Sequence, residues 1–119
     1  MLNSLLSKYR LRSKIYATAL HMEDGSVAHA QMISDLAVEL DAAAGELQNY
    51  VLPRLDEKYH KTLNILMIEY IRAQNWFIGS DKAYIAKSTL RNYGLCVYYE
   101  NKFDIARKAV DNLMVMVKE

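Results

Sequence analysis

Residues 63–77 read Leu63-Asn-Ile-Leu-Met-Ile-Glu-Tyr-Ile-Arg-Ala-Gln-Asn-Trp-Phe77, an apolar segment in the middle of the chain. Its large side chains recur at intervals of three and four residues, which is the period of a buried helical face. The apolar surface extends well beyond one stripe, and a helix that is apolar on most sides is either central or contacts a second subunit. We therefore predict that the helix containing this segment is the core element and the main oligomer interface, with these contact residues: Leu66, Tyr70, Trp76 and Phe77.

The same helical period continues on both sides of this segment, and no stretch alternates polar and apolar residues as a half-buried strand does. Glycine, proline and capping residues separate the periodic segments. Gly25 and Ser26 end one helix and begin the next, and Gly79-Ser80-Asp81 and Asn101 predict two further breaks. The expected helices are Asn3–Met22, Val27–Tyr50, Arg54–Phe77, Lys82–Tyr99 and a fifth that begins at Asn101 and runs to Val117.

The predicted fold class is therefore all-α: one domain over residues 1–119, a bundle of four to five antiparallel helices. In the fourth helix we expect Leu90, Tyr93 and Val97 to face inward, and in the fifth Phe103 and Val110.

Charge is distributed unevenly although the net charge is only +1. Residues 1–15 carry four basic side chains and no acid, whereas residues 16–53 carry six acids and no Lys or Arg. Opposite strips on consecutive segments pair with each other in antiparallel neighbours, or else meet a partner. The basic, amphipathic N-terminus also resembles a mitochondrial targeting segment. Its apolar stripe runs on into the chain, so we interpret it as the first helix.

Composition limits the class of protein. With 52% hydrophobic residues, the chain is too apolar to be intrinsically disordered. Its longest apolar runs, Ile65–Ile68 and Leu95–Tyr99, are far shorter than a membrane span. The one cysteine, Cys96, lies in an apolar run and is expected to be a reduced, buried thiol. We therefore expect a cytoplasmic protein with no membrane partner, no structural zinc and no cofactor.

A candidate catalytic pair is Arg54 and His60. Their spacing resembles the Arg-x4–6-His signature of HEPN ribonucleases, small all-helical domains in which the arginine holds the scissile phosphate and the histidine takes part in proton transfer. The alternative is a solvated first helical turn. Glu57 and His60 have the Glu-x-x-His spacing of di-iron bundles, but the second such motif that those sites require is missing. No complete catalytic set is present, which favours a protein that is not an enzyme.

Tyrosines and basic residues alternate between Lys82 and Tyr99. Aromatic rings beside cations stack nucleobases and contact phosphates, but they also form protein interfaces and cores. All three interpretations stay open. If nucleic acid is bound, the candidate residues are Arg54, Lys58, Lys61, Lys87 and Arg91.

Residues 52–117 resemble a four-helix-bundle family. Leu52-Pro53-Arg54 precedes the long apolar helix, Asp81-Lys82-Ala-Tyr84-Ile85-Ala-Lys87 and Leu90-Arg91 follow it, and Lys102-Phe103-Asp-Ile-Ala106-Arg-Lys108 lies near the end. This order is similar to the accessory variability proteins of diversity-generating retroelements and the proteins encoded in 23S rRNA intervening sequences. The resemblance implies a ring-like homo-oligomer that binds a reverse transcriptase and nucleic acid through basic surfaces.

From the sequence, the first hypothesis is a non-enzymatic accessory or scaffold subunit that works through protein–protein contacts as a homo-oligomer. Its partner is a protein, including another copy of this chain. The second hypothesis is a nucleic-acid-binding accessory protein of a ribonucleoprotein or reverse-transcriptase complex, with RNA or DNA as partner. The third is a HEPN-type ribonuclease.

Overall fold

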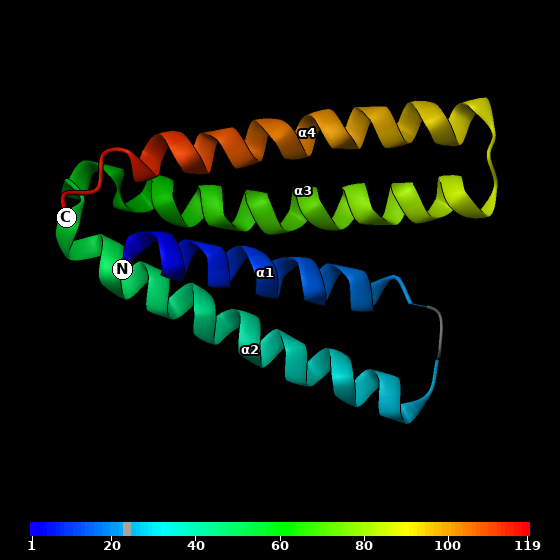
Figure 1. Ribbon diagram of the computed structural model, residues 1–119, viewed down its shortest axis with the longest axis horizontal. Coiled ribbons are helices and arrows are strands. Elements are labelled where there is room, and N and C mark those ends of the chain that lie inside the picture. Colours follow the sequence, from blue (N-terminus) through cyan, green and yellow to red (C-terminus); the bar gives the residue numbers. More distant parts are fainter. Residues whose placement is uncertain (23–24) are drawn as a thin grey trace. The chain divides into compact units, whose positions relative to one another are not determined.

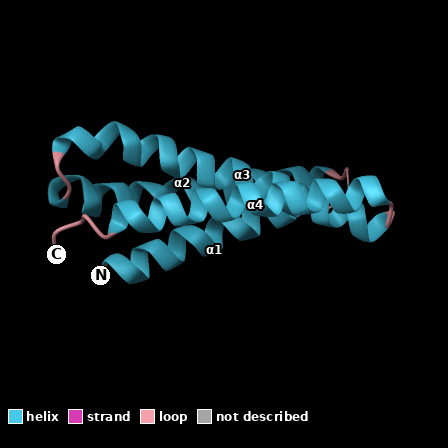
Figure 2. Ribbon diagram, turned by 90° about the horizontal axis from the view of Figure 1, so that it is seen from above, coloured by secondary structure: helices cyan, strands magenta, loops and turns pink. Residues whose placement is uncertain are grey.

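The computed structural model describes residues 1–22 and 25–119 of the chain. Over these residues the protein has four α-helices and no β-strand, so the predicted all-α class is confirmed (Figures 1 and 2). The helices are α1 (Leu2–Leu20), α2 (Val27–Val51), α3 (His60–Ala86) and α4 (Leu90–Met114), with two short 3-10 helices, η1 (Leu52–Arg54) and η2 (Glu57–Tyr59), between α2 and α3. Among the described residues, no helix combines the length and the apolar character needed to cross a membrane.

The described chain forms two compact units, which we call the N-terminal and C-terminal units. The N-terminal unit comprises residues 1–60 and 117–119, and the C-terminal unit comprises residues 61–116. Each is built on an antiparallel helical hairpin, α1 with α2 and α3 with α4 (Figure 1).

Small and aliphatic side chains form the core of the N-terminal unit. Ser13, Ala17 and Ala43 are almost completely buried, and small residues at a helix contact let two backbones approach closely. The large members of this core are Leu2, Leu6, Tyr9, Leu40, Leu47 and Val51. Gly45 is not needed for the approach of α1 to α2, because a Cβ added there would meet nothing within 4 Å.

The predicted pairing of the basic N-terminus with the acidic segment is confirmed. Lys8 Nζ lies 3.1 Å from a carboxylate oxygen of Glu46, and an Arg12 guanidinium nitrogen lies 2.9 Å from one of Glu39. All four side chains are partly exposed, so each pair contributes less than about 1 kcal/mol to stability. The buried side chains of α1 and α2 therefore stabilise the contact more than these ion pairs do.

The turn into α2 has the predicted chemistry. Gly25 has a φ of 64°, the left-handed conformation that favours glycine, and Ser26 Oγ accepts a hydrogen bond from the His29 N–H at 3.0 Å. His29 in turn binds the Ala19 carbonyl through Nε2 at 2.9 Å, which ties the start of α2 to the end of α1. Glu23 and Asp24, also assigned to this break from the sequence, lie outside the described residues.

The predicted start of the central helix at Arg54 is wrong. Pro53 ends α2 through η1, Leu55 is extended, and α3 begins only at His60. The Asp56 side chain caps η2 by accepting from the Lys58 N–H at 3.1 Å. Two short turns therefore replace the first turns of the predicted helix, because Pro53 and Asp56 both favour turn geometry.

The predicted breaks at Gly79-Ser80-Asp81 and at Asn101 are also wrong, because both segments lie inside helices. The Ser80 hydroxyl donates to the Phe77 carbonyl at 2.8 Å, a bond within the helix rather than a cap. The real break follows Ala86. There Thr89 Oγ1 accepts from the Asn92 N–H at 3.1 Å, and Asn92 Nδ2 donates to the Lys87 carbonyl at 2.8 Å. One threonine and one asparagine thus cap the two adjoining helix ends.

Because the break lies later than predicted, the first turns of α4 do not bury the residues that the sequence analysis expected to face inward. Leu90 is 88% exposed and Tyr93 53% exposed, and Val97 is also exposed, so the predicted inward face over residues 82–99 is wrong. Further along α4, Val110 is buried as predicted and Phe103 is partly buried, and Ala106 and Leu113 are buried as well.

Two glycines give a matched prediction. Gly94 lies in the interior of α4 with open space around it, so Gly94→Ala removes a helix-destabilising residue and is expected to stabilise the fold by about 0.5–1 kcal/mol. Gly25→Ala forces a side chain into positive φ and is expected to destabilise the fold by about 1 kcal/mol. The midpoint of thermal unfolding, followed by circular dichroism, measures both. Shifts of the same sign would contradict the assigned α4 or the assigned turn.

Candidate functional site: an aromatic groove on the α3–α4 hairpin

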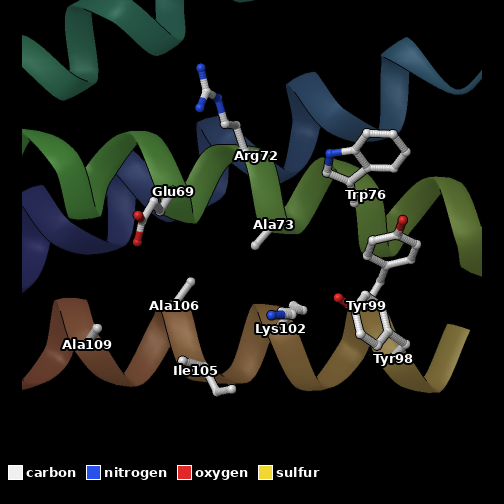
Figure 3. A pocket seen from close by; sticks show the side chains of 10 residues that line it. All are labelled: Glu69, Arg72, Ala73, Trp76, Tyr98, Tyr99, Lys102, Ile105, Ala106 and Ala109. Carbon is white, nitrogen blue, oxygen red and sulfur yellow. The ribbon is translucent and has the colours of Figure 1, made fainter. Parts of the chain in front are cut away.

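A groove of about 400 Å³ lies between α3 and α4 on one face of the C-terminal unit. In Figure 3, α3 contributes Glu69, Arg72, Ala73 and Trp76 to its wall, and α4 contributes Tyr98, Tyr99, Lys102, Ile105, Ala106 and Ala109. The alanines are short side chains in the middle of the groove and at one end, whereas the aromatic rings gather at the other end.

Aromatic contacts build the large end of the groove. The Trp76 and Tyr99 rings are stacked with centroids 5.4 Å apart, and Tyr98 packs its edge against Tyr99 at 5.1 Å. Trp76 is nevertheless 62% exposed and Tyr98 53% exposed. These rings therefore form a rigid rim that still presents much apolar area to solvent.

Ile105 of α4 also lines the groove and is 66% exposed. Single exposed apolar residues are ordinary, but several exposed apolar side chains around one groove mark an interaction site. We call the exposed groove rim formed by Trp76, Tyr98 and Ile105 the aromatic face.

Charges of both signs lie in the groove. The Lys102 Nζ lies 5.4 Å from the centre of the Tyr98 ring, a cation–π contact, while Glu69 points toward α4 (Figure 3). Within the part of the chain that the structure describes, no ion pair joins Glu69 to Lys102. Besides its apolar surface, the groove therefore carries two cations, Lys102 and Arg72, and one anion, Glu69. The Arg72 side chain extends away from α4 (Figure 3).

The predicted interface residues fall into two groups. Tyr70 is buried and packs on Phe103, with ring centroids 5.2 Å apart, and Phe77 stacks on the same ring at 6.0 Å. These two belong to the internal contact between α3 and α4, and Leu66 is partly buried. Trp76 is the predicted interface residue that lies on the aromatic face.

The sequence-based prediction of the interface did not include any residue of α4. Leu95, Tyr98, Lys102, Ile105 and Ala109 follow one another at steps of three, four, three and four residues. This heptad spacing was a usable signal for a second helical seam. The false break at Asn101 divided the stripe between two predicted helices and concealed it.

The predicted nucleic-acid residues are divided between the two units, and within the C-terminal unit Lys61 lies far from Lys87 and Arg91. Arg54 and Lys58 belong to the N-terminal unit, and Lys58 Nζ lies over the Tyr59 ring at 5.1 Å. In the C-terminal unit, Lys61 lies in the first turn of α3, while Lys87 and Arg91 lie beyond its other end. A helix rises about 1.5 Å per residue, which separates Lys61 from Lys87 by about 39 Å along the axis.

Arg54 and His60 each hold backbone in place. The Arg54 guanidinium lies 3.8 Å from the centre of the Tyr50 ring and donates to the Tyr50 carbonyl at 2.8 Å. His60 Nε2 binds the Leu55 carbonyl at 2.9 Å. They do not lie on one helix as expected, since Arg54 is in η1 and His60 begins α3. Glu57 is in η2, so the Glu-x-x-His segment is a 3-10 turn that leads into α3 rather than an α-helical turn.

Cys96 is partly buried rather than fully buried. Burial raises the pKa of its thiol, and the nearby Asp81 carboxylate raises the pKa further. The thiol lies 3.8 Å from that carboxylate as a hydrogen-bond donor. This environment disfavours the thiolate that nucleophilic or metal-binding chemistry requires. Among the described residues, no group of three or more His, Cys, Asp or Glu could hold a metal ion.

The geometry thus defines an all-α protein with an amphipathic groove on one hairpin. Comparison of the chain with protein-family models, curated proteins and solved structures gave no match.

The contacts of Arg54 predict a structural role. Arg54→Ala removes a cation–π contact and a charge-assisted hydrogen bond, and is expected to lower the stability by about 1 kcal/mol. Lys58→Ala is the matched control and is expected to change stability by less than about 0.5 kcal/mol, because Lys58 is exposed. Urea unfolding followed by circular dichroism measures both variants. Unchanged stability of Arg54→Ala with lost RNA cleavage or binding would instead favour the catalytic or nucleic-acid hypothesis.

Proposed function

We propose that the protein is a non-enzymatic accessory or scaffold subunit that works through protein–protein contacts. The observation that carries the proposal is the aromatic face, where Trp76 and Tyr98 are more than half exposed although rings of this size are normally covered. Tryptophan and tyrosine dominate binding energy at protein interfaces because they bury a large area at little cost in side-chain entropy. The Trp76–Tyr99 stack also fixes the indole before binding, which lowers the cost of ordering it.

Site-specific photo-crosslinking tests the proposal. A photoreactive amino acid replaces Ile105 on the aromatic face, or Arg107 as the matched control. Arg107 is also exposed on α4, but lies about 200° further round the helix. After irradiation in the native host, we expect defined crosslinked peptides of one protein from position 105 and background from position 107. Equal products at both positions would overturn the proposal.

A nucleic-acid-binding accessory protein is the second candidate. The observation in its favour is Lys102, which lies over Tyr98 beside the exposed Trp76, a combination that could stack a base and contact a phosphate. Glu69 in the same groove opposes it, because a carboxylate repels phosphate.

This candidate predicts that end-labelled RNA binds with an affinity that falls steeply with salt and drops further in Lys102→Ala. The measurement is fluorescence anisotropy. Lys108→Ala, an exposed cation outside the groove, is the control. The absence of binding at low salt would exclude this candidate and leave the first.

A further inference from the structure

We infer that the occupant of the aromatic face is the same face of a second copy of this chain, in a two-fold symmetric dimer. This inference rests on the proposed function and specifies its partner. It draws on three features of the α3–α4 hairpin: a second apolar seam on α4, a combination of projecting and recessed side chains on one face, and a pair of opposite charges in the groove.

The first feature is that α4 has two apolar faces. One faces α3 and includes Phe103 and the buried Ala106 and Val110. The other carries the exposed Tyr98 and Ile105 and has the heptad spacing noted above. An amphipathic surface helix carries polar residues on its outer face, whereas heptad spacing there is the pattern of a seam for another helix.

The second feature is that the face carries both a projection and a hollow. Trp76 and Tyr98 stand at one end of the groove, and Ala106 and Ala109 leave room toward the other (Figure 3). A two-fold interface sets the same patch of both subunits against each other, with each subunit supplying what the other lacks. An antiparallel arrangement would lay the aromatic end of one copy over the alanine end of the other.

The third feature is charge. Lys102 interrupts the apolar stripe of α4, and a lone cation in a helical seam must meet an anion when the seam is covered. The face itself supplies one, because Glu69 lines the same groove and no ion pair of the described chain uses it. In a symmetric dimer, Lys102 of each copy forms an ion pair with Glu69 of the other copy. The second cation that lines the groove, Arg72, extends away from α4 (Figure 3). Lys102 and Glu69 are therefore the charges that a second copy matches by symmetry.

Charge exchange between two variants tests the dimer. Lys102→Glu replaces the cation that α4 contributes to the groove with a carboxylate, and Glu69→Lys replaces the carboxylate of α3 with a cation. The matched controls, Lys108→Glu and Glu100→Lys, change the same charges at exposed positions of α4 outside the groove. Sedimentation velocity from micromolar to submillimolar protein gives the association constant, and circular dichroism confirms that each variant is folded.

The wild-type chain and both controls are expected to form dimers. Each groove variant alone is expected to associate about tenfold more weakly or worse, since close charge pairs at interfaces contribute at least this factor. An equimolar mixture of the two variants, and the double variant Glu69→Lys/Lys102→Glu, are expected to recover much of the association.

Three outcomes would overturn the inference: a monomer at every concentration, a dimer that the groove variants do not weaken, or a larger closed assembly. The crosslinking experiment separates this failure from that of the proposed function. If the protein is a monomer and position 105 crosslinks to a different protein, the proposed function stands and the dimer is refuted. A monomer without specific crosslinks refutes both.

Discussion

The stack of aromatic rings between α3 and α4 is the interaction on which the candidate site depends. Phe103 contacts both Tyr70 and Phe77, and Trp76 lies flat on Tyr99, which is one turn before Phe103 on α4. Tilted and offset rings of this kind contribute about 0.5–1.5 kcal/mol per pair beyond the area that they bury. Where the rings give way to Ala73 and Ala106, the same two helices leave a hollow. The groove is therefore a direct consequence of the order of large and small side chains along the hairpin.

The N-terminal unit is stabilised differently. Small buried residues such as Ala17 and Ala43 allow α1 and α2 to approach closely, and exposed ion pairs flank the contact. The last residues of the chain also join this unit. The Lys118 N–H donates to the Arg54 carbonyl at 2.8 Å, and Glu119 accepts from the Tyr50 hydroxyl at 3.2 Å. Arg54, a candidate for phosphate binding by its spacing from His60, is thus part of a network that joins the end of α2 to the C-terminal residues.

The helix breaks show how local sequence signals compete with context. Gly79-Ser80-Asp81 has the residues of a stop and a cap, yet α3 continues through it. A glycine inside a helix costs only about 1 kcal/mol, less than the aromatic contacts on either side contribute together. Tyr84 lies beyond the predicted break and pairs with Tyr93 of α4 at 5.8 Å, a contact available only because α3 continues. The chain instead turns where Thr89 and Asn92 satisfy both helix ends.

The sequence by itself determined the helical class and the turn at Gly25, but left open whether the basic and acidic strips pair with each other or meet a partner. The helical class and the turn depend on periodicity and backbone conformation, both of which are local. Only the tertiary structure decided that Tyr70 and Phe77 are internal while Trp76 is exposed, and that Ile105 and Lys102 share a groove with Glu69. Which side of an apolar helix is covered depends on the helix packed against it. The phase of α4 relative to α3 was in turn set by a break that the local signals placed incorrectly.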